Sequence, residues 1–179
     1  IAQIGASNQR RLRITAKTPA RLEALSASYA RETRLVTFLA NAGWSGDTAT
    51  RLQIAGDAST RRYERLHRDG DKSETAVLMD WRAGPDGPPV VDGQSYSKRA
   101  HLAEAAEVYC RVSRYLSDCA VGVPQIYKAD EGEGFVLLED LGTRTLEVMA
   151  LENDVDLPAF YLEATETLVH LHGTCAPDF

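Results

Sequence analysis

The sequence has no long apolar run. No stretch of the 179 residues approaches the ~20 apolar residues that a membrane-spanning helix needs. The first residues also lack the charged segment and following apolar segment of a secretory signal peptide. We therefore expect a soluble, cytoplasmic protein without a membrane partner, and 44% hydrophobic residues are enough to bury one sizeable core.

Cysteine is scarce. Cys110, Cys119 and Cys175 are odd in number and widely spaced, which argues against a disulfide framework and against a zinc site of paired CxxC motifs. His170, His172 and Cys175 form an HxHxxC pattern, but residues two apart on a helix point in different directions. We expect reduced, mostly buried thiols and no metal ligands in this chain.

Positive charge is in the minority. The 20 Lys and Arg residues against 26 Asp and Glu give a net charge of -6, which argues against direct binding to nucleic acid. Arginine is nevertheless clustered over Arg10 to Arg13 and over Arg61 to Arg65. Such clusters suit the phosphate groups of a small anionic ligand.

Several common catalytic motifs are absent. The sequence contains neither GxxxxGK[ST] nor GxGxxG, so it carries neither a Walker phosphate loop nor a dinucleotide fingerprint. The absence of GxSxG and HExxH removes the commonest hydrolase and metalloprotease interpretations.

Hydrophobic periodicity predicts an α+β chain. Gly43 is expected to end the first helix, with Trp44 folding back on its last turn. The predicted elements, in order, are a lone edge strand near residues 11–15, one or two helices over Pro19 to Ala42, three antiparallel strands within 50–81, a Gly- and Pro-rich loop over 82–97, a helix capped by Ser97 that runs to Cys119, strands at 124–130 and 134–142, and a helix from Pro158 to Gly173.

Three of these elements carry further expectations. The strand at 134–142 is nearly continuous in apolar residues, which predicts a central place in the sheet. The helix from Ser97 is expected to bury Leu102, Ala105, Tyr109, Val112 and Leu116, and the last helix carries Tyr161, Ala164, Leu168 and Leu171 on one face.

The segment GDASTRRYERL, Gly56 to Leu66, has a composition that suits phosphate. Gly56 allows a close backbone approach, Ser59 and Thr60 add hydroxyl donors, and the following arginines present planar forks that match phosphate oxygens. The same residues could form an ordinary hairpin turn, and composition leaves both interpretations open.

The string VLLEDLG, Val136 to Gly142, places two carboxylates after a buried strand. Because neighbours in an extended chain point to opposite sides, Glu139 and Asp140 are poor candidates for an acid/base pair acting on one bond. The segment is either a hinge whose backbone faces a ligand or a strand end with solvated acids.

Five motifs in order resemble one enzyme family. GDASTRRYERL, AVLMD, HLAEAAEVYCRV, GVPQIYKAD and GFVLLEDLG resemble, in this order, motifs of the aminoglycoside-phosphotransferase-like family of kinase fold. The resemblance covers about residues 36–173. The nearest branch is the bacterial cell-wall amino-sugar kinases that act on the anomeric position of N-acetylmuramate and N-acetylglucosamine. The N-terminal RRLRITAK and PARLEAL look like the tail of the small ATPase of the tRNA threonylcarbamoyladenosine pathway, to which such enzymes are fused in some bacteria.

The resemblance implies a fold and a domain organisation. It implies a protein-kinase-like N-terminal lobe, with an antiparallel sheet and one long helix, followed by the start of a helical C-terminal lobe. The expected boundaries are 1–26 for the tail of a preceding ATPase-like domain, 27–142 for the N-terminal lobe and 143–179 for the beginning of the C-terminal lobe.

The resemblance also implies a nucleotide site. Met79 occupies the position where kinases usually place a phosphate-binding lysine, so Arg61 or Arg62 is expected to supply that charge. Glu104 is the nearest match to the acid of the regulatory helix, with Glu107 as the fallback. The implied nucleotide-binding residues are Gly56, Asp57, Ala58, Ser59, Thr60, Arg61 and Arg62 over the phosphates, Met79 and Glu104 beside them, and Leu138, Glu139, Asp140 and Leu141 in a hinge that meets the adenine.

The implied function is the nucleotide-binding half of an ATP- and Mg²⁺-dependent phosphotransferase acting on a small hydroxylated substrate, an amino sugar. The family's catalytic HxDxxxxN-like loop and metal-binding aspartate do not occur in the sequence. We therefore expect no catalytic or metal-binding residue here and no activity from the 179 residues alone. Two alternatives are a nucleotide-responsive partner of the tRNA-modification ATPase without kinase activity, and a purely structural domain.

Overall fold

The structure is a computed structural model that describes residues 18–45, 49–54, 61–68, 74–81, 89–95, 99 and 105–174. It divides into two compact units, Ile1–Thr37 and Phe38–Phe179. The strand expected near residues 11–15 lies outside the described residues. The domain boundaries expected after residues 26 and 142 stay predictions.

One helix, α1 (Thr18–Ala40), occupies the range in which one or two were predicted. Gly43 has a φ of 81° and its N–H donates to the Ala40 carbonyl at 3.0 Å, while the N–H of Trp44 donates to the Leu39 carbonyl at 2.8 Å. This is a Schellman ending, in which glycine takes the left-handed conformation without strain. Leu39 and Trp44 are both buried, so the expected folding back of Trp44 is confirmed.

Helical periodicity in α1 did not translate into burial along its length. Four of its large apolar side chains are exposed, namely Leu22, Leu25, Tyr29 and Val36. Within the described residues, none of the helices combines the length and apolar character needed to cross a membrane.

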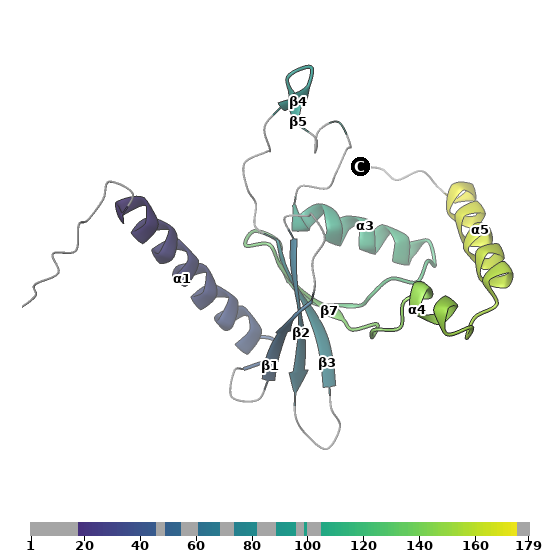
Figure 1. Cartoon of the computed structure of the whole chain (residues 1–179), viewed down its shortest axis with the longest axis horizontal. Coiled ribbons are helices and arrows are strands. Elements are labelled where there is room, and N and C mark those ends of the chain that lie inside the picture. Colours follow the sequence, from purple (N-terminus) through teal and green to yellow (C-terminus); the bar gives the residue numbers. More distant parts are fainter. Residues whose placement is uncertain are drawn as a thin grey trace, which may run out of the picture. The chain divides into compact units, whose positions relative to one another are not determined.

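Five antiparallel strands form the main sheet, as predicted (Figure 1). Their spatial order is β1-β2-β3-β7-β6, so β7 lies between β3 and β6 and its central place is confirmed. The strands are β1 (Ala49–Gln53), β2 (Arg61–Arg68), β3 (Glu74–Trp81), β6 (Ile126–Asp130) and β7 (Phe135–Glu139).

Strand register assigns side chains to the two faces of this sheet. Arg61 pairs with Trp81, Tyr63 with Met79, and Arg65 with Val77. Because side chains alternate along a strand, these six residues share one face, and Arg62 and Glu64 lie on the other. We call the first the α3 face, because helix α3 packs on it.

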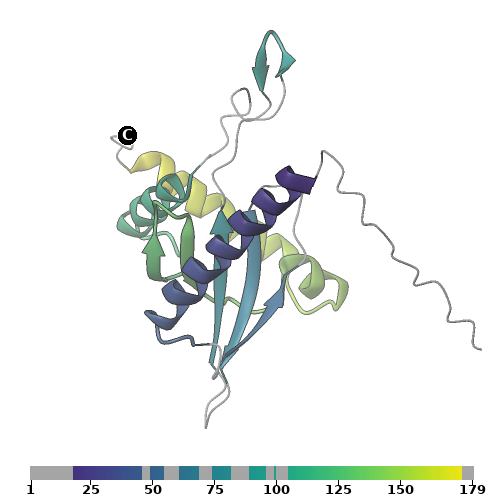
Figure 2. The ribbon, with the colours of Figure 1, turned by 90° about the vertical axis from the view of Figure 1, so that its left-hand side faces the viewer.

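Helix α3 (Ala106–Asp118) covers this face (Figures 1 and 2). Ala106 and Cys110 form a buried cluster with Met79, Trp81, Val136 and Leu138 of the sheet. Small side chains on the helix allow its backbone to approach the strands closely. Tyr109 packs against this cluster. Ala105, Tyr109, Val112 and Leu116, which were expected to be buried, are only half-buried.

The prediction of one continuous helix from Ser97 to Cys119 is wrong, because the helix is interrupted at Ala105, although Arg99 is helical. Ala105 is extended, with φ of -143° and ψ of 151°, so α3 begins at Ala106. Contact of Ala106 and Cys110 with the sheet sets the helix position, and local periodicity does not encode that tertiary contact. The expected cap Ser97 lies outside the described residues.

The loop prediction for residues 82–97 missed a hairpin. β4 (Pro89–Val91) pairs antiparallel with β5 (Gln94–Ser95) around Asp92 and Gly93, whose φ angles are 51° and 74°. Consecutive positive φ values favour Asp-Gly in tight hairpin turns. That dipeptide was the available sequence signal.

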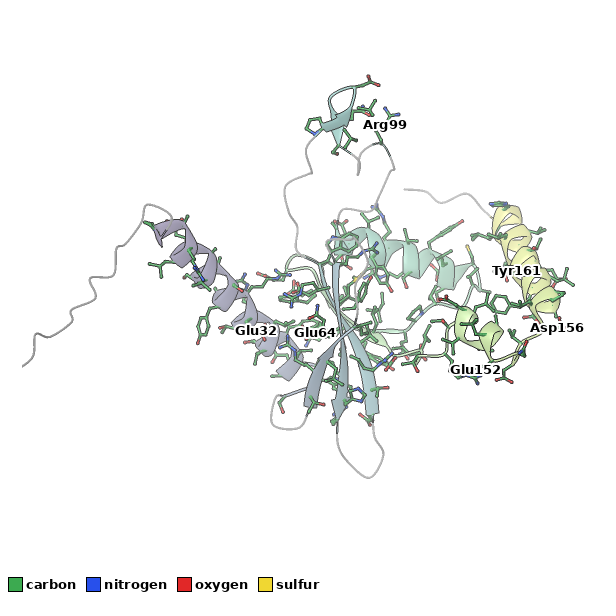
Figure 3. All side chains as sticks on the ribbon, in the orientation of Figure 1. Glu32, Glu64, Arg99, Glu152, Asp156 and Tyr161 are labelled. Carbon is green, nitrogen blue, oxygen red and sulfur yellow. The ribbon has the colours of Figure 1, made fainter. Side chains whose placement is uncertain are left out.

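Two helices follow the sheet. α4 (Leu146–Leu151), capped by Thr145, was not predicted, whereas α5 (Leu157–Gly173) begins and ends as expected with Pro158 in its first turn. Figure 3 labels Tyr161 and Asp156 on and beside α5. Within the described residues α5 buries no side chain, and Tyr161 and Leu168 are 62% and 56% exposed.

Candidate functional site

Arg61 begins β2 on the α3 face of the sheet. Its guanidinium carbon lies 4.8 Å from the centroid of the Trp81 ring, within cation–π range. The stacking restricts the arginine before any ligand arrives. The predicted phosphate residues that precede it, Gly56, Asp57, Ala58, Ser59 and Thr60, lie outside the described residues.

Arg62 lies on the opposite face. Its Nη2 is 3.9 Å from Oε1 of Glu64, and its side chain is 48% exposed. Glu64 also accepts a 2.6 Å hydrogen bond from Nε of Arg51. The two arginines that the sequence could not tell apart therefore have different surroundings.

Met79 is a core residue. It has no exposed surface and packs with Ala106 and Cys110 of α3. Its position brings no charge to the α3 face, whereas Arg61 and Arg65 of β2 do, and Arg65 is paired with Asp140. Glu104 lies outside the described residues, and Glu107 is exposed in the first turn of α3.

Tyr63 and Tyr109 are partly buried beside this core. Burial raises the pKa of the Tyr109 phenol, the neighbouring Tyr63 and Cys110 add to the rise, and the positive charge of Arg61 opposes it. Tyr109 therefore remains protonated at neutral pH, where its hydroxyl can donate a hydrogen bond.

The predicted hinge, Leu138 to Leu141, begins in the last two residues of β7. Leu138 is buried, and the N–H of Glu139 donates to the Gln125 carbonyl at 2.8 Å while its carboxylate accepts from the Gln125 N–H at 3.0 Å. Leu141 is 70% exposed. Leu138 and Glu139 are thus part of the sheet, and Leu141 is the residue of this segment that is exposed to solvent.

Asp140 forms an ion pair with Arg65. Nε and Nη2 of Arg65 lie 2.7 and 2.9 Å from the two carboxylate oxygens. Hydrogen bonds from Arg65 hold the pKa of Asp140 below its usual range, burial opposes this, and the Gly142 N–H and Thr75 hydroxyl assist it. Asp140 is therefore not the solvated acid that one sequence interpretation allowed.

Sequence reasoning named Arg65 only as part of an arginine cluster suited to phosphate, and it did not single out Trp81 or Tyr109 as site residues. A signal was present in RRYERL, because strand alternation puts Arg61, Tyr63 and Arg65 on one face. The partners of these side chains come from distant parts of the chain, and only the folded structure reveals them.

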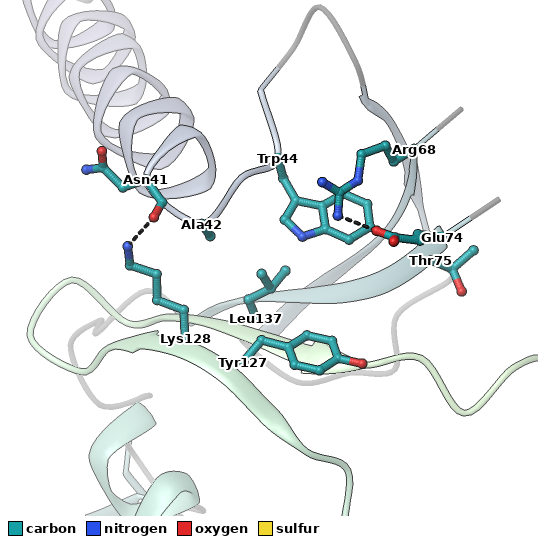
Figure 4. A pocket seen from close by; sticks show the side chains of 9 residues that line it. All are labelled: Asn41, Ala42, Trp44, Arg68, Glu74, Thr75, Tyr127, Lys128 and Leu137. Carbon is teal, nitrogen blue, oxygen red and sulfur yellow. Dashed lines mark hydrogen bonds and ion pairs between the residues drawn. The ribbon is translucent and has the colours of Figure 1, made fainter. Parts of the chain in front are cut away.

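A separate cavity of about 670 Å³ opens on the other side of the sheet (Figure 4). Lys128 Nζ donates to the Asn41 carbonyl at 2.7 Å, and Arg68 lies 4.5 Å over the Trp44 ring and donates to the Gly43 carbonyl at 3.1 Å. Both cations thus satisfy carbonyls at the end of α1. Their structural role accounts for the two positive charges here, and none of the predicted site residues that the structure describes lines this cavity.

The described residues contain no group of three or more His, Cys, Asp or Glu side chains that could hold a metal ion. His170 Nε2 instead lies 2.8 Å from the Cys119 carbonyl oxygen. Cys110 and Cys119 are free and buried, as predicted. Cys175 lies outside the described residues.

Comparison with known proteins confirms the resemblance. Residues 50–179 match the phosphotransferase enzyme family. In an alignment of 162 residues, the chain is 30% identical to the N-acetylmuramate/N-acetylglucosamine kinase of Caulobacter vibrioides (strain ATCC 19089 / CIP 103742 / CB 15), and the match covers 86% of the chain. The match covers 43% of that relative, so the chain spans less than half of its length.

Neither comparison supports the ATPase-like tail or the partner module without kinase activity. Because the family match spans well over half of the sequence, the chain belongs to the phosphotransferase enzyme family.

Proposed function

We propose that the chain is the nucleotide-binding part of an ATP- and Mg²⁺-dependent cytoplasmic kinase of a small hydroxylated substrate. The observation that carries this proposal is the placement of Arg61 over Trp81, on the face of the sheet that also carries Met79. A cation at that place substitutes for the lysine that Met79 does not provide.

Phosphate binding would occur at the start of β2. Gly56 to Thr60 would form the turn over the phosphates, with their backbone N–H groups and hydroxyls as donors. Arg61 would donate two parallel hydrogen bonds to phosphate oxygens. Its stacking on Trp81 reduces the conformational entropy that binding must remove.

Purine binding would occur at the segment from Leu138 to Leu141. The N–H of Glu139 is already bonded to Gln125, whereas Leu141 is exposed. We therefore place the adenine contact at the backbone of Leu141.

Phosphoryl transfer would move the γ-phosphoryl group of ATP to a substrate hydroxyl oxygen, with ADP as leaving group and loss of the hydroxyl proton. Mg²⁺, when bound, would neutralise negative charge on the ATP phosphates. Its ligands and the catalytic aspartate are expected outside these 179 residues, which alone would transfer no phosphate. The exposed apolar side chains of α5 are a surface on which a further part of the protein would pack.

An amino sugar is the substrate that we propose. The support is the similarity to the Caulobacter relative, which is an N-acetylmuramate/N-acetylglucosamine kinase. Phosphorus NMR of Mg²⁺-ATP with either sugar, incubated with the full-length protein or with the 179-residue chain, tests this. We expect a sugar-phosphate resonance with the full-length protein only, and its absence for every sugar tested would contradict the proposal.

A further inference from the structure

Arg65 links β2 to the chain that follows β7. Its Nε donates to Oδ2 of Asp140 at 2.7 Å, and its Nη2 donates to Oδ1 at 2.9 Å and to the Gly142 carbonyl oxygen at 2.9 Å. The arginine therefore holds both the carboxylate and the backbone two residues further on.

The segment from Asp140 to Gly142 also has a hydrogen bond within itself. The Gly142 N–H donates to Oδ1 of Asp140 at 2.9 Å, and Gly142 has a φ of 86°, a conformation that favours glycine. Leu141 lies between these two fixed points and is itself exposed. Contacts on both sides therefore determine the path of its backbone.

The pair is shielded from solvent. The side chains of Arg65 and Asp140 are 20% and 4% exposed, so salt screens the interaction less than it screens a surface pair. A bidentate arginine–carboxylate pair also fixes orientation, which a lysine in the same place would not do.

One strand thus reaches both ends of the nucleotide site proposed above. Arg61 and Arg65 lie four residues apart on the same face of β2, a separation of about 13 Å along a strand. Arg61 lies where the phosphates are expected, and Arg65 lies at the segment expected to meet the adenine.

We propose that Arg65 is a positioning residue for purine recognition. It does not touch the nucleotide but fixes the backbone of Leu141, through Asp140 and Gly142, in the conformation that the base requires. This inference rests on the proposed function. It predicts that loss of the bidentate contact weakens adenosine and ATP equally, because both ligands carry the same base.

The experiment compares Arg65→Lys with Arg51→Lys in the full-length protein. Arg51 is a matched control, because it also pairs with a carboxylate, Glu64, at 2.6 Å, with side-chain exposures of 27% and 12%, on the opposite face of the sheet. Calorimetric titration measures binding of adenosine and of ATP, and urea unfolding at the same pH measures stability. Arg61→Ala provides a phosphate-end comparison.

We expect Arg65→Lys to weaken both adenosine and ATP by about tenfold, and Arg51→Lys to change neither by more than about twofold. Arg61→Ala should weaken ATP alone. Should Arg65→Lys prove unstable, Asp140→Asn removes one partner of the same pair and is expected to give the same equal weakening. Unchanged adenosine affinity in a folded Arg65 or Asp140 variant would overturn the inference, as would an equal loss in Arg51→Lys. A wild-type protein that binds neither ligand would overturn the proposed function and this inference with it.

Discussion

The backbone of Gly134 lies against the backbone of Trp81. The Trp81 N–H donates to the Gly134 carbonyl at 2.8 Å, and a Cβ added to Gly134 would lie 2.1 Å from the Trp81 carbonyl oxygen. Gly134 also has a φ of 77°. Glycine at this position therefore permits the junction of β3 and β7 that places Trp81 beside Arg61.

Replacing Gly134 with alanine should lower the free energy of unfolding by about 2–4 kcal/mol, because the methyl group meets backbone that cannot move alone. Gly132→Ala is the matched control, since the nearest atom to its Cβ would be a side-chain oxygen of Asp130 at 3.7 Å. Urea unfolding of both variants measures the difference. Equal stability of the two variants would contradict the close approach.

Asp140 should make the free energy of unfolding depend on pH in the acidic range. A carboxyl whose folded pKa is lowered stabilises the protein above its unfolded pKa of about 3.9, and the contribution disappears as pH falls through the folded pKa. Asp140→Asn should therefore cost about 2 kcal/mol at pH 7, and the gap to wild type should shrink below about pH 4. Urea unfolding at pH 7, 4 and 3 tests this.

Asp154→Asn is the control for this acid dependence. Asp154 pairs with Arg144 at the surface, with side-chain exposures of 61% and 56%, and such pairs contribute less than about 1 kcal/mol. A gap between wild type and Asp140→Asn that stays constant down to pH 3 would count against the buried ion pair.

Arg61 and Arg62 should differ in ATP binding. Arg61→Ala removes the cation stacked on Trp81 and should weaken ATP by about tenfold. Arg62→Ala changes a residue on the other face, beside Glu64, and should have less than about a twofold effect. Calorimetric titration of the full-length protein measures both affinities. The assignment would be refuted by equal losses, or by a loss confined to the Arg62 variant.

His170 should anchor α5 to the end of α3. His170→Ala removes the contact to the Cys119 carbonyl and should cost about 1 kcal/mol. His172 lies two residues further along the same helix and is exposed, as His170 is, so His172→Ala should cost less than about 0.5 kcal/mol. Thermal or urea unfolding of both variants provides the measurement. A larger loss for His172 would mean that α5 packs differently.

Most of the secondary structure could be predicted from residues that are neighbours in the sequence. The Gly43–Trp44 pair predicted how α1 ends, and the apolar run at 135–138 predicted a central strand. These signals are local because a cap or a strand depends mainly on neighbours in sequence. The break at Ala105 was not predictable in this way, because α3 takes its position from contacts with the sheet.

The sequence by itself determined the α+β class, the order of the five sheet strands, the family and the arginine-rich segment at the start of β2. Only the tertiary structure decided that Arg61 stacks on Trp81, that α3 covers the face of Arg61 and not that of Arg62, and that Arg65 holds Asp140. The physical reason is that a strand's alternation sorts its side chains into two faces, whereas their partners come from strands and helices far away in sequence.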